Sequence, residues 1–167
     1  METINLEFKY TEAEAIRAVV EVTKSTSKSL SIMPWIGGFL IAMTLVSAFT
    51  HGKNFLTFGL LLFFGILFLS IPILTIWTAK RDFKKNPSAN KTIRWQINEA
   101  WLRNETEGTE AKFIWENLIK VVERKSGFLL FPQQRLAHWI PKGAFRSDKE
   151  MDEFRNLVRK HGINFKG

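Results

Sequence analysis

Hydrophobic and polar positions divide the chain into a polar beginning, two long apolar runs and a longer polar remainder. The runs at residues 31–50 and 55–79 contain no Asp, Glu, Lys, Arg or His. At about 1.5 Å per residue, a helix over either run can cross the roughly 30 Å hydrocarbon core of a bilayer. A chain of 167 residues could hardly bury two such helices, and the first run starts too far from Met1 for a secretory signal. The pattern predicts a transmembrane helical hairpin, residues 31–79.

The short connection at residues 51–54 favours antiparallel neighbouring helices, with a glycine suited to a helix end and an asparagine suited to a cap. This connection carries Lys53 as its one Lys or Arg. Most basic residues near the hairpin lie beside its two ends instead: Lys24, Lys28, Lys80, Arg81, Lys84, Lys85 and Lys91. The positive-inside rule then places both termini in the cytoplasm, and Trp35 and Trp77 are expected together at the cytoplasmic interface.

Two features inside the hairpin affect its shape and contacts. Pro72 removes one backbone donor and frees the carbonyl of Phe68, which predicts a kink that Ser70 or a neighbouring helix helps to satisfy. Gly38 and Ala42 form a small-xxx-small pair that would let another helix approach closely. No ionisable residue lies at membrane depth, so the sequence suggests no ion or proton site there.

Residues 1–30 are predicted to form a cytoplasmic strand and helix. Apolar and polar residues alternate over residues 4–10, which is typical of a strand with one buried face. Thr11 and Glu14 then make a capping box at the start of an amphipathic helix that leads towards the membrane. The strand could pair with later strands, which would make the hairpin an insertion in one cytoplasmic domain.

The remainder is read as a basic juxtamembrane linker at residues 80–91 and a cytoplasmic domain at residues 92–167. "TIRWQIN" alternates as a strand and "AWLRNETEG" ends in a glycine turn. Further strands are predicted at residues 112–115, 118–124, 128–131 and 136–140, which makes about seven with the first. A second capping box, Ser147 and Glu150, opens a final helix with an apolar stripe.

The formal net charge of +8 arises almost entirely after the hairpin. Basic residues with six tryptophans could indicate nucleic-acid binding. However, the densest cluster directly follows the second apolar run, where membrane topology and attraction to anionic lipid, about 1 kcal/mol per residue, are a sufficient explanation. We therefore expect no nucleic-acid partner. The predicted contacts with lipid head groups are Lys80, Arg81, Lys84 and Lys85.

Sequence motifs for catalysis are lacking. The chain has no cysteine, its three histidines share no metal-ligand spacing, and we find no nucleophile elbow, P-loop or dinucleotide fingerprint. His138 is the one candidate catalyst, and it has no partner in the sequence. We expect no enzyme activity, no cofactor and no metal site, with an enzyme that uses His138 as a hypothesis still open.

Several short motifs in the last third carry a resemblance to a known family. Trp115 followed by Asn117 and Leu118, then "GFLLF", then "WIPKGAF" before an acidic helix resemble the C-terminal region of the YcxB-like family. The resemblance implies a small protein of the bacterial cytoplasmic membrane, with two adjacent transmembrane helices before this domain. It supplies a fold and identifies no catalytic residues. The motif residues, expected to be structural, are Trp115, Ile140, Pro141, Lys142 and Phe145.

A strand meander followed by one C-terminal capping helix also resembles a pleckstrin-homology-like (PH-like) antiparallel β-barrel. The sequence lacks the dense Lys/Arg loop between the first two strands that phosphoinositide-binding members of that class use. Together these features predict an integral inner-membrane α+β protein whose cytoplasmic domain is a non-enzymatic interaction module. It would bind a protein partner or form a homo-oligomer. The alternative is a subunit of an oligomeric channel or transporter, since one hairpin is too small for a transport pathway.

Overall fold

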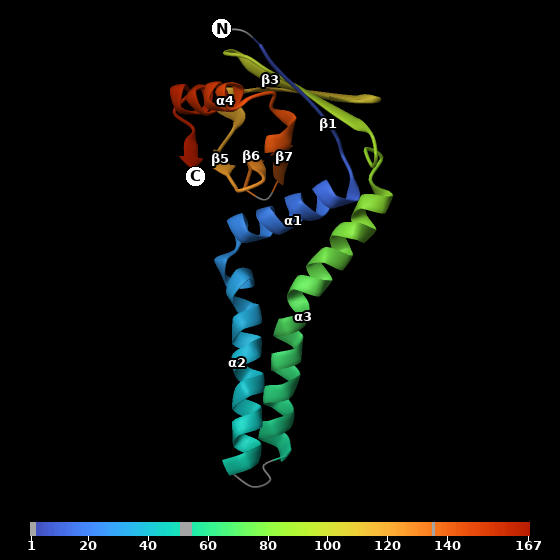
Figure 1. Ribbon diagram of the computed structural model, residues 1–167, viewed down its shortest axis with the longest axis vertical. Helices are drawn as coiled ribbons and strands as arrows, with labels where there is room; N and C mark the ends of the chain where they lie inside the picture. The colour runs from blue at the N-terminus through green and yellow to red at the C-terminus, as the bar shows by residue number, and fades with distance from the viewer. Residues whose placement is uncertain (1–2, 51–54, 135) are drawn as a thin grey trace.

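The computed structural model describes residues 3–50, 55–134 and 136–167. The described elements follow one another in this order: β1 (Ile4–Lys9), α1 (Glu12–Thr26), α2 (Lys28–Thr50), α3 (Phe55–Lys85), β2 (Thr92–Ile97), β3 (Trp101–Thr106), β4 (Thr109–Ile114), 3₁₀ helix η1 (Trp115–Asn117), β5 (Lys120–Glu123), β6 (Gly127–Gln133), β7 (Leu136–Pro141), 3₁₀ helix η2 (Lys142–Ala144), α4 (Asp148–Lys160) and β8 (Asn164–Lys166). Helices α2 and α3 form a long hairpin, the sheets lie at its far end, and α1 lies across between them (Figure 1).

The two helices of the hairpin are packed closely where two glycines face each other. A Cβ atom on Gly37 would lie 2.8 Å from the carbonyl oxygen of Gly65, and a Cβ atom on Gly65 would lie 2.6 Å from the Ile41 side chain. Only glycine therefore allows this approach of the two backbones. The predicted pair Gly38 and Ala42 takes no part in it and is exposed. The predicted turn and caps at residues 51–54 lie outside the described residues.

Helix α3 changes direction partway along its length (Figure 1). Pro72 lies inside this helix and is the expected cause, because it cannot donate a hydrogen bond to the preceding turn. The Ser70 hydroxyl donates to the carbonyl of Leu67 at 2.7 Å, and not to the carbonyl of Phe68 that the proline leaves free.

The two tryptophans expected at one interface lie at different levels along the hairpin. Gly37 lies against the backbone of Leu69, so Trp35 is roughly level with Leu69. Trp77 follows about two helical turns later, about 12 Å farther along α3. The shared place of the two tryptophans at the cytoplasmic interface stays a prediction. Only Trp77 lies beside the basic cluster, where the guanidinium of Arg81 is 5.3 Å from its ring centre.

The first part of the predicted linker, residues 80–85, is helical and continues α3. Helix α3 continues to Lys85 because it has an apolar side at Ala79 and Phe83, which are both buried. The ring of Phe83 lies 5.6 Å from that of Tyr10, just before α1. The charged side chains of residues 80–85 lie on the exposed side of this last segment. The end of α3 is thus packed and does not form a free tether.

The strands form two four-stranded sheets and not one closed barrel. Sheet A has the order β1-β2-β3-β4, with antiparallel neighbours throughout. Sheet B has the order β7-β6-β5-β8, and the unpredicted strand β8 lies parallel to β5. No pairing between the two sheets occurs among the described strands. The expectation of a single closed antiparallel barrel is therefore corrected to two sheets around a shared core.

The predicted pairing of the first strand with the later ones is confirmed. Strand β1 pairs with β2 in the register Leu6 to Trp95 and Phe8 to Ile93. Beyond the strands, the Tyr10 N–H donates to the Lys91 carbonyl at 2.9 Å. The helical segment, α1 to α3, therefore follows β1 and precedes β2, which are neighbouring strands of one sheet. The segment is an insertion between these two strands.

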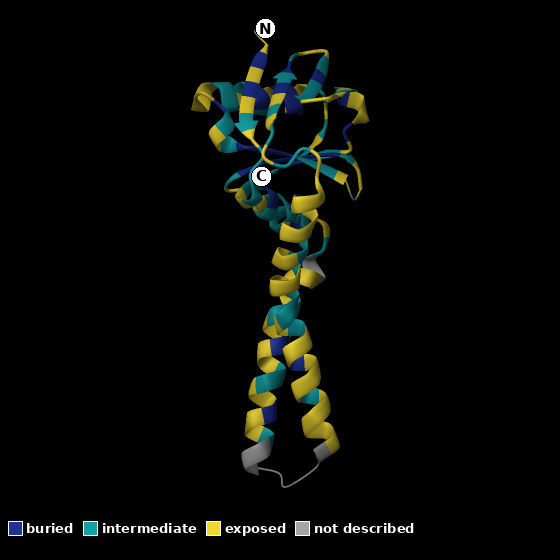
Figure 2. Ribbon diagram, turned by 90° about the vertical axis from the view of Figure 1, so that its right-hand side faces the viewer, coloured by how far each residue is buried: buried dark blue, intermediate teal, exposed yellow. Residues whose placement is uncertain are grey.

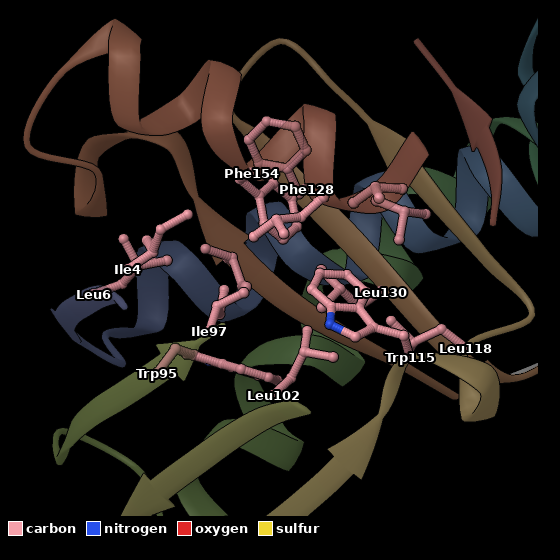
Figure 3. Packing of buried hydrophobic residues seen from close by; sticks show 14 of the residues in the cluster. Ile4, Leu6, Trp95, Ile97, Leu102, Trp115, Leu118, Phe128, Leu130 and Phe154 are labelled. Atoms are coloured by element: carbon pink, nitrogen blue, oxygen red, sulfur yellow. The ribbon is translucent and has the colours of Figure 1, made fainter. Parts of the chain in front are cut away.

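Sheet B is covered on both faces, which explains the continuous apolar run in β6. Phe128 and Leu130 point into the main core between the two sheets, while Leu129 and Phe131 belong to a second cluster against α1. Helix α4 closes the main core with Phe154 and two further apolar residues (Figure 3). Figure 2 shows buried residues concentrated in this end of the molecule, whereas most of the hairpin is exposed.

The structure predicts that β1 is essential for the fold. Leu6 is 1% exposed in the main core, so Leu6→Asp should lower the free energy of unfolding by about 4 kcal/mol or prevent folding, because an unpaired carboxylate would be buried. Lys9→Asp introduces the same side chain at an exposed position of the same strand and should change stability by about 0.5 kcal/mol or less. Thermal unfolding of the full-length protein, followed by near-UV circular dichroism, would compare them. Equal melting of both variants would contradict the packing of β1.

Candidate functional site at the junction of the helices and the β domain

Helix α1 joins the apolar hairpin to the sheets. It starts at Thr11, whose hydroxyl accepts a hydrogen bond from the Glu14 N–H at 3.3 Å, as the capping box predicts. Ala18 and Val22 pack on the second apolar cluster, which includes Leu129 and Trp139 of sheet B. This side of α1 therefore covers the outer face of sheet B. The sequence did not reveal this contact, because periodicity shows which side of a helix is apolar but not what covers it.

Polar contacts hold α1 to both of its neighbours. On the sheet side, the Trp139 indole N–H donates to the Glu14 carboxylate at 2.8 Å, and the Arg124 guanidinium donates to the Ser25 hydroxyl at 2.9 Å. On the other side, the Lys80 ammonium of α3 lies 3.5 Å from a carboxylate oxygen of α1. Helix α1 is therefore attached both to sheet B and to α3.

A hollow of about 300 Å³ lies inside this junction. The inner face of sheet A consists of three cross-strand rows, and the row farthest from the helices is entirely apolar: Ile4, Ile97, Leu102 and Phe113. Towards the helices, β3 and β4 place Asn104, Thr106, Thr109 and Ala111 on this face instead. These shorter side chains leave the space that the hollow occupies, opposite His138 of β7.

The hollow contains polar groups that are not used in the fold. Trp95 is 1% exposed, and its indole N–H is buried without a hydrogen-bond partner among the described residues. Neither Asn104 nor His138 makes a side-chain hydrogen bond to any other described residue. A hollow lined by several polar side chains that the fold leaves without hydrogen bonds is a candidate binding site. Applying the strand alternation to β3 would have identified Asn104 as a polar residue on the inner face.

His138, the candidate catalyst, is packed among aromatic rings. Its ring centre lies 5.6 Å from that of Trp95 and 5.1 Å from that of Phe113. Burial lowers its pKa below the ordinary value of 6.5, which favours the neutral ring near pH 7. Within the described ranges, no group of three His, Asp or Glu side chains is placed to hold a metal ion. His138 therefore belongs to the lining of the hollow.

The motif residues Ile140, Pro141 and Phe145 are buried in the β domain, and Lys142 holds an ion cluster. The Lys142 ammonium lies 2.6 Å from the Glu123 carboxylate, and the Arg155 guanidinium lies 2.7 Å from the same oxygen. The hydrogen bond from Arg155, aided by Lys142, lowers the pKa of Glu123 from 4.5 to about 2.

The remaining motif residue, Trp115, is also part of the core. Its indole N–H donates to the Asn98 carbonyl at 2.9 Å, which ties η1 to the end of β2. Its ring stacks on that of His161, with 4.9 Å between the ring centres. The five motif residues thus lie in the packing of the β domain. The basic cluster at residues 80–85 is at the end of α3, a separate place in the structure.

The ion cluster predicts a pH-dependent contribution to stability. Because the pKa of Glu123 is lowered on folding, its contribution is complete above pH 4.5 and is lost as the pH falls towards 2. Glu123→Gln should therefore cost about 2 kcal/mol at pH 7 and progressively less as the pH approaches 2. Glu116→Gln, at an exposed position of η1, is the matched control and should have little effect. Thermal unfolding measured across this pH range would test both, and a constant difference would contradict the assignment.

The motif residues lie in the part of the chain that resembles a known family. No curated protein and no solved structure matches the chain. Residues 97–158 match the family described as YcxB-like protein. The match begins at the last residue of β2 and ends in α4, so it includes η1, the motif at Ile140–Phe145 and the ion cluster around Glu123. Residues 97–158 of this chain are therefore a YcxB-like domain.

Proposed function

We propose that this chain is an integral membrane protein whose β domain is a non-enzymatic interaction module. The hairpin supports membrane insertion because α2 and α3 each contain a stretch long and apolar enough to span a bilayer. Their large apolar side chains point outward: Trp35 is 81% exposed, Leu56 75% and Ile73 69%. A surface of this kind is unfavourable in water and is stabilised by contact with lipid tails.

The proposed location is the cytoplasmic (inner) membrane of a bacterium, with both termini in the cytoplasm. The support comes from the basic residues at the end of α3, which are exposed next to the β domain: Lys80, Arg81, Lys84 and Lys85. Each basic group near an anionic surface contributes about 1 kcal/mol of attraction. The same side of the hairpin carries α1, sheet A and sheet B, so the whole β domain would lie on the cytoplasmic face.

We further propose that the β domain is PH-like. Strands β1 to β4 are consecutive neighbours in sheet A, strands β5 to β7 are consecutive neighbours in sheet B, and α4 packs against the core that the sheets share. This order agrees with the meander and closing helix of that class. Two features differ from it: the helical segment between β1 and β2, and the short strand β8 beside β5.

The two-sided attachment of α1 carries the functional proposal. Glu14 of α1 binds Trp139 of sheet B, and Glu12 of α1 pairs with Lys80 of α3. Helix α1 thereby connects the hairpin physically to the β domain. Self-association is the interaction that the hairpin best supports, because Gly38 has open space around it while its neighbour Gly37 is used inside the hairpin.

Transport receives no comparable support. The hydroxyls of Thr44, Ser70 and Thr75 donate to carbonyls of their own helices at 2.7 to 2.8 Å. In this arrangement they satisfy the helix backbone rather than line a polar path. We therefore propose an interaction role for the chain and do not propose a channel.

Topology is tested with reporters at the two ends and in the connection. A reporter that works only in the cytoplasm should be active when it is fused before Met1 or after Gly167. A tag inserted between Gly52 and Lys53 should be labelled from outside intact cells. The physical reason is the excess of basic residues beside α1 and at the end of α3. A connection tag that is labelled only after the cells are opened would reverse the orientation.

Self-association is tested by disulfide cross-linking, which is specific here because the chain has no cysteine of its own. Gly38→Cys and Ala42→Cys should each give a covalent dimer in bilayers after mild oxidation, because both positions would lie at the helix contact. Met43→Cys, exposed on a different side of α2, is the control and should give several times less dimer. Equal cross-linking at all three positions would indicate random collision, and monomeric protein throughout would contradict self-association.

A further inference from the structure

We infer that the hollow between sheet A and β7 is a binding site for a small uncharged molecule that both donates and accepts hydrogen bonds. The hollow is lined by strands β2, β3, β4 and β7, by Ala18 of α1, and by the segments that join the helices to sheet A. Its volume of about 300 Å³ lies at the lower end of the range for ligand pockets in proteins. This inference does not depend on self-association of the hairpin.

The space exists because of the side chains that β3 and β4 place on the inner face. At one end of these strands, Leu102 pairs with Phe113 and fills the core. Toward the helices, Asn104 pairs with Ala111, and Thr106 with Thr109, at the corresponding inner positions. Polar residues at inward positions of a core strand are unfavourable for stability, and natural proteins tolerate them mainly at functional sites. The change from large apolar to small polar residues marks the boundary of the site.

Three polar side chains in the lining are available to a ligand. The Asn104 amide can both donate and accept, and it makes no hydrogen bond to any other described residue. The His138 ring and the Tyr10 hydroxyl likewise make no hydrogen bond to another described side chain. A ligand with an amide-like group would give these side chains hydrogen-bond partners.

The absence of charge in the lining selects the class of ligand. Every described residue that lines the hollow is uncharged at neutral pH, including His138. Burial also raises the pKa of Tyr10, so its hydroxyl stays protonated and can donate. A charged ligand would lose part of its hydration and would find no opposite charge in this lining. A neutral molecule with amide-like groups matches the donors and acceptors present.

The site also contacts the joints between the β domain and the helices. Tyr10 precedes α1, Ala18 lies on α1, and Asn86 and Ser88 follow α3. A molecule in the hollow would therefore touch both connections through which the helical segment enters and leaves sheet A. The ion cluster around Glu123 offers no comparable site, because its charged side chains are paired with one another.

Benzamide is a suitable probe, with benzoate as its charged isostere and toluene as its apolar one. The full-length protein in lipid nanodiscs would be titrated while the indole N–H resonance of Trp95 is followed by NMR, with the resonance assigned from Trp95→Phe. We expect a saturable shift with benzamide in the low millimolar range. Benzoate and toluene should bind roughly tenfold more weakly, as expected for a desolvated charge and for lost hydrogen bonds.

Ala111→Leu should fill the hollow and weaken benzamide binding at least tenfold, while Ala100→Leu, in the exposed turn between β2 and β3, should leave binding unchanged. The comparison of the three probes on the unaltered protein holds even if Ala111→Leu fails to fold. The inference is overturned if benzamide does not move the Trp95 resonance, if benzoate binds as well as benzamide, or if a folded Ala111→Leu protein binds benzamide normally.

Discussion

The burial of β6 on both faces is the constraint on which the rest of the structure depends. Phe128 and Leu130 need sheet A and α4 on one side, whereas Leu129 and Phe131 need α1 on the other. Each large side chain contributes about 1.5–3 kcal/mol when it is fully buried, so neither cover can be removed without a large loss of stability. The outer cover is the helix that leads into the hairpin, and the position of the domain relative to the apolar helices follows from the core itself.

The pairing of β1 with β2 is a second constraint on how the helical segment is joined to the β domain. The helical segment leaves the sheet after Lys9 and returns at Thr92, and these two residues are partners in the register. An insertion with its ends so close leaves the sheet undisturbed. However, sheet A fills only part of its inner face with large side chains, and the unfilled part faces the insertion. The hollow with Trp95 and His138 is thus located where the two parts of the molecule meet.

Local patterns predicted much of this fold because local physics determines it. The alternation over residues 4–10, the caps at Thr11 and Ser147, and the two apolar runs each correspond to an observed element. The extension of α3 to Lys85 was missed, because four basic residues concealed an apolar side of only two residues. The separation into two sheets, strand β8 and the hollow depend on cross-strand register and on long-range packing, which alternation along one strand does not specify.

The family match makes the role of the remaining segments clearer. Residues 97–158 include β3 to β7 and most of α4, but they lack β1 and nearly all of β2. A fragment with these bounds would expose the edge of β3 and the side of the core that Leu6 and Trp95 cover. It would also lack α1 over Leu129 and Phe131. We therefore expect that the matched segment does not fold alone, because strands on both sides of the apolar hairpin close its core in this structure.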